Sequence, residues 1–367
     1  MTTIVHLTSP AQFGGLERVV SGLCRETVAR GHRVVLIATL SPGDPVPPWA
    51  EALREAGVVV EPLHLSSRAY ARERRTVRGL LRRHGAQVVH THGYRPDALH
   101  VGMVKSLGLP IVSTAHGFSA TRFKGKVYEW FQKRAWRRFD AVVAVSQPLV
   151  EAIARAGVPR ERIVLIRNGL SQGASAAVTR GEARARLGLP EATAVLGWVG
   201  RLSEEKDPQL AIEAFALLAA GSARLCMIGA GPQAEECRAQ VARLGLGDRV
   251  TLAGAVPDAG PLLSAFDALV LSSRTEGTPM VILEAAAAGV AVVSTAVGGV
   301  PDLLGDDAGW LVPAGDAEAL ASAMGAALGD GAERIRRAER LRARLATDAG
   351  SDWVEQYLEL YRRLRTE

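Results

Sequence analysis

Residues 268–271 read Ala-Leu-Val-Leu, and residues 274–289 read Arg-Thr-Glu-Gly-Thr-Pro-Met-Val-Ile-Leu-Glu-Ala-Ala-Ala-Ala-Gly. The apolar run predicts a buried parallel strand, and the Leu- and Ala-rich run from Met280 predicts a helix closed by Gly289. The loop between them, Ser272 to Pro279, is therefore expected at the carboxyl end of a strand and the amino end of a helix. An open α/β sheet binds ligands at this place, where the free N–H groups of a helix start favour an anion.

Two carboxylates frame this stretch, Glu276 in the loop and Glu284 one turn inside the helix. A carboxylate accepts hydrogen bonds from neighbouring hydroxyls, such as those of a ribose or a pyranose. Together with an anion-binding backbone, the two side chains fit a nucleotide diphosphate sugar. The simpler interpretation is that they are acidic residues near a helix N-terminus, where negative charge is favourable.

The composition bounds the class of protein. With 367 residues, of which 48% are hydrophobic, the chain is long enough for two globular domains. Its three cysteines, Cys24, Cys226 and Cys237, have no metal-binding or redox spacing and predict reduced thiols in a cytoplasmic compartment. We expect no signal peptide, and no apolar run approaches the roughly 20 residues of a membrane span.

Positive charge is concentrated in the first half of the chain. Residues 1–175 contain 25 Lys and Arg against 12 Asp and Glu, a net +13, whereas residues 176–367 contain 19 against 26, a net −7. Two expected helices, Arg68–His84 and Arg122–Phe139, each carry seven basic residues and one acidic residue; the first also contains Tyr70, and the second contains several aromatic residues. They suit an anionic membrane surface or a lipid-diphosphate acceptor, which predicts peripheral binding at the inner face of the membrane. The alternative is a solvated helix face with the aromatic residues in the core. No nucleic-acid motif accompanies them, so no nucleic-acid partner is expected.

Strand-like and helix-like segments alternate along the chain. This alternation predicts two doubly wound parallel sheets of the α/β class. The expected domains are residues 1–172 and 173–349, and residues 350–367 form a last amphipathic helix. Strands are expected at residues 3–7, 34–37, 58–60, 88–90, 111–114, 142–145 and 163–166 in the first domain, and at 195–199, 250–256 and 268–271, before 229, from 292 and at 309–313 in the second.

Two more loops of the second half follow expected strands. Residues 200–208 read Gly-Arg-Leu-Ser-Glu-Glu-Lys-Asp-Pro, and residues 227–232 read Met-Ile-Gly-Ala-Gly-Pro. Arg201 at the end of a buried strand is unusual for a mere surface charge. Arg201 and Lys206 are fixed cations that can stabilise a departing diphosphate without a metal.

These motifs resemble those of the family 4 glycosyltransferases. Glu276 and Glu284 resemble the E-x7-E motif, residues 200–207 resemble G-R-L-x-x-x-K-G with Asp207 in place of the last glycine, and residues 229–232 resemble G-x-G-P. In the first half, Gly14-Gly15 resemble the glycine-rich first loop, and residues 116–117 resemble the His-Gly that follows the middle strand of the first domain. Asn168-Gly169 resemble the N-G after the last strand, although Leu170-Ser171 depart from the usual continuation.

The resemblance implies a GT-B fold, in which two Rossmann-like domains face a central cleft and the C-terminal helix crosses back to the first domain. It implies retaining, metal-independent transfer of a sugar from a nucleotide-diphosphate donor to a hydroxyl, in bacterial polysaccharide or glycoconjugate assembly. The acceptor is then a glycan or a lipid-linked sugar on the side of the first domain. No cofactor is expected.

The resemblance also implies roles for single residues. Arg201 and Lys206 neutralise the diphosphate, Glu276 holds sugar hydroxyls, Glu284 holds the ribose, and His116 approaches the sugar. The expected catalytic residues are His116, Arg201, Lys206 and Glu276. The expected donor-binding residues are Gly14, Gly15, Arg201, Lys206, Gly231, Val256, Glu276, Gly277, Thr278, Pro279, Met280, Val281 and Glu284.

Other interpretations remain at this stage. A nucleotide-sugar 2-epimerase has the same fold, and a catalytically silent nucleotide-sugar-binding protein would not need the intact Arg201, Lys206, Glu276 and Glu284. His90 and His92 share one face of a strand and could bind a metal, but no third ligand is evident, so we expect no metal site. The sequence does not identify the donor base, which is UDP, GDP, ADP or TDP.

Overall fold

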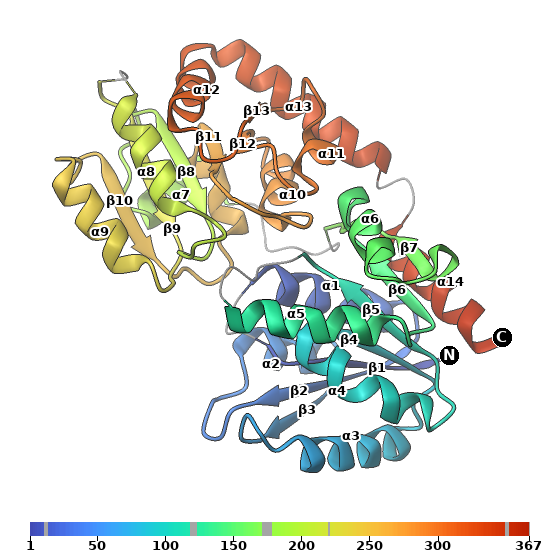
Figure 1. Ribbon diagram of the computed structural model, residues 1–367. Coiled ribbons are helices and arrows are strands. Elements are labelled where there is room, and N and C mark those ends of the chain that lie inside the picture. Colours follow the sequence, from blue (N-terminus) through green and yellow to red (C-terminus); the bar gives the residue numbers. More distant parts are fainter. Residues whose placement is uncertain (11–13, 118–122, 171–177, 219–220, 349–351, 367) are drawn as a thin grey trace. The chain divides into compact units, whose positions relative to one another are not determined.

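The computed structural model describes residues 1–10, 14–117, 123–170, 178–218, 221–348 and 352–366. The chain forms two compact units (Figure 1). The first consists of Met1–Gln172 and Ser351–Glu367, and the second of Gly173–Gly350. Arg122, the first residue of the second expected basic helix, lies outside the described residues.

The first unit contains a seven-stranded parallel sheet in the order β3-β2-β1-β4-β5-β6-β7. This order, which reverses direction between β1 and β4, is that of a doubly wound sheet. The strands are β1 (Thr3–Thr8), β2 (Arg33–Leu40), β3 (Val59–His64), β4 (Val88–His92), β5 (Ile111–Ala115), β6 (Ala141–Ala144) and β7 (Ile163–Leu165).

Helices cover both faces of this sheet because its strands are apolar on both faces. Val35 and Ile37 pack with α3, α4 and α5, whereas Val34 and Leu36 pack with α1 and α2. The helices of this unit are α1 (Gly15–Ala29), α2 (Pro48–Glu55), α3 (Tyr70–His84), α4 (Tyr94–Lys105), α5 (Phe123–Trp136), α6 (Gln147–Arg155) and α14 (Trp353–Thr366), with the short η1 (Arg160–Arg162).

The second unit contains a six-stranded parallel sheet in the order β10-β9-β8-β11-β12-β13. Its strands are β8 (Val195–Val199), β9 (Arg224–Ile228), β10 (Val250–Gly254), β11 (Ala268–Leu271), β12 (Ala291–Thr295) and β13 (Trp310–Val312). Its helices are α7 (Arg180–Arg186), α8 (Pro208–Leu217), α9 (Ala234–Arg243), α10 (Met280–Ala287), α11 (Val300–Leu304), α12 (Ala317–Gly329) and α13 (Gly331–Asp348), with the short η2 (Gly260–Ala265).

The helices of the second unit also divide between two faces. Side chains of α8, α9 and α12 share one buried cluster with Leu196 and Trp198 of β8. Helices α10 and α13 contribute nothing to that cluster and pack against each other and against β12. The expected α/β class with two doubly wound parallel sheets is therefore confirmed.

Most element boundaries agree with the sequence to within a few residues, and β3 shows the largest extension. It runs through Pro62 to His64, although the β-rich run ended at Val60. Proline is tolerated there because β3 is the edge strand of its sheet and its outer N–H positions need no partner. Among the helices of the described residues, none combines the length and the apolar character needed to cross a lipid bilayer.

Candidate functional site

Four loops of the second unit meet at the carboxyl ends of its strands. They follow β8, β9, β11 and β12 and span residues 200–207, 229–233, 272–279 and 296–299. Backbone hydrogen bonds join the first pair: Leu202 N–H donates to Ala230 O over 3.0 Å, and Gln233 N–H donates to Leu202 O over 2.9 Å. The other pair is joined by Gly299 N–H, which donates to Gly277 O over 2.9 Å.

Two glycines allow the backbones of these loops to approach each other closely. A Cβ on Gly231 would lie 2.3 Å from Leu202 O, and a Cβ on Gly298 would lie 1.9 Å from Glu276 O. Gly298 also has φ of +54°, in the left-handed region that favours glycine. Any larger residue at either position would therefore push apart two loops, at least one of which carries predicted site residues.

The central contact of the site joins the first and third of these loops. Lys206 Nζ donates to both carboxylate oxygens of Glu276, over 2.6 and 2.7 Å, and Ser273 Oγ donates to Glu276 Oε1 over 2.7 Å. The Glu276 side chain is only 6% exposed, whereas that of Lys206 is 29% exposed. Two residues predicted to be catalytic therefore form a largely buried, hydrogen-bonded ion pair.

Buried serine and threonine hydroxyls fix the backbone beneath this ion pair. Ser272 Oγ donates to Asp207 O over 2.7 Å and accepts from Trp198 Nε1 over 3.1 Å. Thr295 Oγ1 donates to Ser273 O over 2.7 Å. Since these hydroxyls come from β12 and the loop after β11, they tie the Lys206 loop and the Glu276 loop to the sheet. The motif comparison did not identify these contacts.

Asp207 occupies the position where the family pattern has glycine. The backbone conformation at this position explains why glycine is usual there. Its φ is +45° and its ψ is +57°, so the residue before α8 is left-handed. Aspartate tolerates this region better than most residues do. Its carboxylate also accepts from Arg274 Nε over 2.7 Å, which adds a second ion pair between the same two loops.

Arg201 and the start of α10 supply groups for an anion. Arg201 is exposed, and within the described residues it forms no ion pair. Helix α10 begins at Met280 after Pro279, so the N–H groups of its first turn lie at the carboxyl end of β11. Glu284 lies one turn inside this helix and is half-buried.

The predicted residues fall into two groups. Gly14, Gly15 and His116 belong to the first unit, where Gly15 starts α1 and His116 follows β5. Gly14 has an extended backbone with φ of −173°, so its torsion angles do not require glycine. All other predicted residues belong to the second unit, where Val256 follows β10.

Around His116, the structure reveals a cluster of four histidines. His6 Nδ1 lies 2.9 Å from His92 Nε2, and His92 Nδ1 lies 3.2 Å from His116 Nε2. His90 contacts two hydroxyls instead, Tyr361 Oη at 2.6 Å and Thr114 Oγ1 at 2.8 Å. Because Tyr361 belongs to α14, the last helix of the chain is tied directly to β4.

These histidines are neutral at pH 7. Burial lowers the pKa of His6 to about 3 and that of His116 to about 4. Burial, followed by repulsion from neighbouring histidines, lowers the pKa of both His90 and His92. His116 can therefore donate or accept a hydrogen bond at pH 7 but carries no charge.

The sequence showed no third ligand beside His90 and His92, but the structure places His6 next to them. Nitrogen atoms of His6, His90 and His92 lie within 4.8 Å of one another. The third residue was missed because it comes from β1, which pairs with β4 so that His6 lies beside His90. A histidine in each of two expected central strands was the available signal, but only strand pairing brings them together.

The Asn168-Gly169 turn contacts the last helix. A Cβ on Gly169 would lie 2.3 Å from Cδ1 of Trp353, the first residue of α14. The glycine therefore provides room for a buried indole, which gives this turn a packing role that the sequence did not indicate.

Known proteins match this chain along most of its length. Residues 193–330 match the family described as "Glycosyl transferases group 1", and residues 13–172 match "Glycosyltransferase Family 4". The 2-deoxystreptamine N-acetyl-D-glucosaminyltransferase of Streptomyces fradiae is 30% identical over 397 residues, which cover 96% of this chain and 92% of that protein. The chain belongs to the family 4 glycosyltransferases. The family expected from its motifs is thereby confirmed.

Other relatives of this glycosyltransferase agree with that assignment. The putative colanic acid biosynthesis glycosyltransferase WcaL of Escherichia coli K12 is 32% identical over 248 residues, covering 64% of this chain and 59% of WcaL. Anabaena Alr3699/HepE, solved in complex with UDP and glucose, superposes with a TM-score of 0.84 at 20% identity, covering 100% of both chains. WaaG, a glycosyltransferase involved in lipopolysaccharide biosynthesis, gives a TM-score of 0.77 at 20% identity, covering 98% of this chain and 99% of WaaG. These structures show the GT-B fold.

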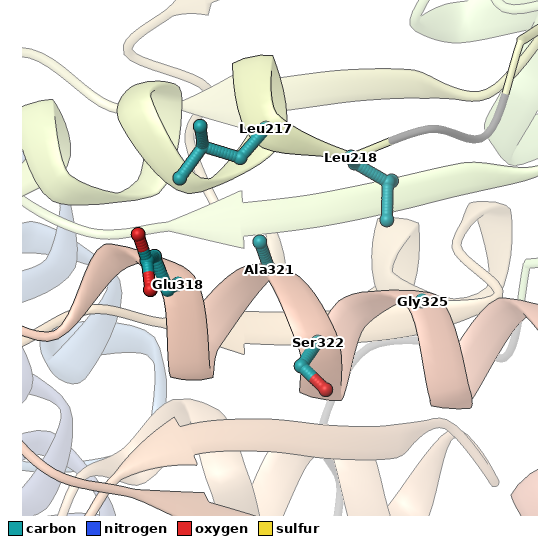
Figure 2. Close-up of a pocket in the computed structure, with 6 residues that line it drawn as sticks. All are labelled: Leu217, Leu218, Glu318, Ala321, Ser322 and Gly325. Atoms are coloured by element: carbon teal, nitrogen blue, oxygen red, sulfur yellow. The ribbon is translucent and has the colours of Figure 1, made fainter.

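A surface pocket of the glycosyltransferase lies apart from these residues. Figure 2 shows its lining residues on α12 and at the end of α8. Its volume is about 370 Å³. It is lined by Leu217, Leu218, Glu318, Ala321, Ser322 and Gly325. None of the residues predicted from the sequence lines this pocket, so it is not the candidate site.

Proposed function

We propose that the glycosyltransferase moves a sugar from a nucleotide-diphosphate donor to a hydroxyl of a glycan or lipid-linked acceptor, with retention and without a metal. The observation that carries this proposal is the pair Lys206–Glu276 at the strand ends, beside the exposed Arg201 and the start of α10. Two cations and free helix N–H groups suit a diphosphate, whose charge grows as the anomeric bond breaks.

The hydrogen bonds of Glu276 leave limited room for the donor sugar. A carboxylate offers about four acceptor positions. Lys206 occupies two and Ser273 a third. Glu276 can therefore accept about one sugar hydroxyl while keeping its present partners, and a second only if the Lys206 ammonium turns towards the diphosphate. In this proposal Glu284 binds the ribose, and Gly231 and Val256 lie near the base.

His116 would contact the donor sugar as a neutral group. With a pKa lowered to about 4 by burial, it is not a proton donor for general acid catalysis at pH 7. A neutral imidazole can still donate a hydrogen bond to an oxygen of the sugar or of the leaving phosphate. The Anabaena protein solved with UDP and glucose makes UDP-sugars the first donors to test.

Membrane association is part of the proposal, and α5 provides its strongest support. Tyr128, Trp130 and Phe131 are 56, 59 and 51% exposed, so these aromatic residues are not in the core. Trp136, by contrast, is buried and donates from Nε1 to Asp97 on α4 over 3.0 Å. An exposed aromatic face on a basic helix suits the inner, anionic face of a cytoplasmic membrane. On α3, the arginines from Arg72 to Arg83 are exposed and would add electrostatic attraction.

A thermal-shift panel with UDP-, GDP-, ADP- and TDP-sugars, repeated with a chelator, tests donor binding. A ligand that binds only the native state raises the melting temperature. Arg201→Ala should reduce the shift, whereas Arg243→Ala, which removes an exposed arginine at the end of α9, should not. The absence of a shift with every nucleotide, with and without anionic vesicles, would contradict the proposal.

Turnover then separates transfer from the alternatives. A transferase releases the nucleotide diphosphate in proportion to glycosylated acceptor, and the anomeric configuration of the product reports retention. A 2-epimerase converts the donor sugar without an acceptor, and a silent binding protein does neither.

A further inference from the structure

Three histidine rings of the first unit form a continuous hydrogen-bonded chain. It runs from His6 through His92 to His116, over 2.9 and 3.2 Å. His6 and His92 are buried, and His116 is half-buried. Within the described residues, two ring nitrogens of this chain have no partner: Nε2 of His6 at one end and Nδ1 of His116 at the other.

The chain has two arrangements in which every hydrogen bond is satisfied. A neutral imidazole has one N–H donor and one acceptor nitrogen. In the first arrangement each ring carries its proton on Nδ1, and donation runs from His6 to His116. In the second each ring carries its proton on Nε2, and donation runs in the opposite direction.

The unpartnered Nε2 of His6 distinguishes the two arrangements. His6 is 0% exposed, so in the second arrangement this nitrogen would be a buried N–H without an acceptor, which folded proteins rarely contain. In the first arrangement Nε2 of His6 carries no proton and is an acceptor without a donor. The N–H at the other end then lies on the half-buried His116, where solvent or a ligand can accept it. The first arrangement is therefore favoured.

We propose that His92 is a positioning residue which, anchored by His6, holds His116 with its proton on Nδ1. The hydrogen bond made by one ring nitrogen determines which nitrogen of the ring is protonated. Burial keeps all three rings neutral, as the chain requires. Among the described residues, the other titratable groups in contact with the chain of rings are His90, Tyr357 and Tyr361, and burial raises the pKa of both tyrosines.

The consequence for catalysis rests on the proposed function. If His116 faces the donor sugar, it presents an N–H donor and not an acceptor, because its Nε2 is occupied by His92. The atom it meets on the ligand must then be an acceptor, such as a hydroxyl or phosphate oxygen. The position of the proton itself is a property of the free protein and is tested without any donor.

The alternative is that the same side chains bind a metal ion. His6, His90 and His92 are close enough to share one, but both nitrogens of His90 already contact hydroxyls of Tyr361 and Thr114. No carboxylate among the described residues hydrogen-bonds to any of the four rings. A divalent charge buried there would lack an anionic partner, which is costly. The hydrogen-bonded chain is therefore the better account.

Nitrogen NMR of the unaltered, histidine-labelled protein tests the proposal directly. We expect His6, His92 and His116 each to show a protonated Nδ1 and an unprotonated Nε2 at pH 7. We also expect N–H···N couplings from His6 to His92 and from His92 to His116. The loss of a signal in His116→Asn assigns that ring. A proton on Nε2 of His116, or metal-bound shifts for these rings, would overturn the proposal.

A substitution then tests whether His92 sets the proton position. His92→Phe removes the donor to His116 Nε2, and the ratio of Nδ1–H to Nε2–H forms of His116 should fall about fivefold, the contribution of one neutral hydrogen bond. His90→Phe is the matched control: it alters a buried ring of the same cluster, next to His92, but leaves the chain intact, so the ratio should not change. An unchanged ratio in His92→Phe, or an equal fall in both variants, would refute the positioning role.

Discussion

Lys206 Nζ lies 2.6 and 2.7 Å from the two carboxylate oxygens of Glu276, so the cation assigned to the diphosphate and the carboxylate assigned to the sugar are partners. This pairing links two loops that are 70 residues apart in sequence. We expect the pairing to affect both the stability of the protein and the rate of sugar transfer, and substitutions can separate the two effects.

Lys206→Met should lower both stability and transfer. It leaves a carboxylate that is 6% exposed with Ser273 as its one remaining donor among the described residues, which should lower the free energy of unfolding by about 1–3 kcal/mol. It also removes a cation from the leaving group, so kcat/KM should fall about 100-fold or more. Denaturant unfolding and a transfer assay with a UDP-sugar measure the two effects.

The double variant Lys206→Met with Glu276→Gln separates these effects. A neutral amide at position 276 needs no cation, so stability should recover by more than half of the loss. Transfer should stay low because the cation is still absent and because position 276 has lost the carboxylate assigned to the sugar. Recovery of transfer together with stability would show that Lys206 acts only as a partner of Glu276.

Stability should fall steeply as the pH falls below about 6.5, because the buried histidines are neutral in the folded protein. The folded pKa is lowered to about 3 for His6 and about 4 for His116, so between these values and 6.5 the unfolded chain binds more protons. Each such histidine contributes a loss of about 1.4 kcal/mol per pH unit in this window. Urea unfolding at pH 7 and pH 5 measures the slope, and His6→Asn should reduce it. A stability that is flat between pH 7 and pH 5 would contradict this account.

The histidine cluster shows where sequence reasoning stops. Each strand was predictable from its apolar run, and the loops with the residues predicted for the site were correctly expected to follow the carboxyl ends of strands. His6, however, meets His92 only because β1 pairs with β4, and neither run specifies its partner. The pairing of Lys206 with Glu276 was hidden for the same reason: motif spacing identifies the residues but does not determine side-chain contacts between loops.

Local chemistry was predictable when it depended on neighbours in sequence. Helix α10 begins at Met280, and Gly289 is left-handed with φ of +69°, as its position after the Ala-rich run indicated. For α5 the sequence left open whether the aromatic residues lie in the core. Trp136 is buried, whereas Trp130 is exposed, and the difference follows from which side faces Asp97 and the sheet.

Gly169→Ala should destabilise the docking of α14. The new Cβ would lie 2.3 Å from Trp353 Cδ1, and a buried indole cannot move aside easily. We expect a loss of about 1–3 kcal/mol, measured by thermal unfolding, with faster hydrogen exchange in α14. Gly79→Ala in α3 is the control: nothing lies within 4 Å of its Cβ, so the greater helix propensity of alanine should raise stability slightly. Equal effects of the two substitutions would refute the packing role of Gly169.

Asp207 should be replaceable by glycine more readily than by alanine. Both substitutions lose the ion pair with Arg274, but only alanine keeps the strain of a left-handed residue with φ of +45°. Asp207→Ala should therefore be less stable than Asp207→Gly by about 1 kcal/mol. Comparing these two variants by denaturant unfolding removes the contribution of the lost carboxylate. If the order were reversed, the backbone conformation before α8 would not explain the glycine of the family pattern.

The exposed face of α5 should bind anionic vesicles. Trp130 and Phe131 pack edge to face at 5.0 Å between ring centroids and remain more than half exposed, which is unusual for large apolar side chains. Replacing both by serine should weaken sedimentation with vesicles containing phosphatidylglycerol at least tenfold, because two interfacial aromatics are lost. Ile335→Ser, which removes a side chain of the second unit that is 59% exposed, is the control and should bind like the unaltered protein. Because exposed basic residues on α3 and α5 add an electrostatic contribution, salt should weaken binding of all three proteins. If the double variant binds as well as the unaltered protein, then α5 is not the membrane contact, and its aromatic face has to be explained by another partner.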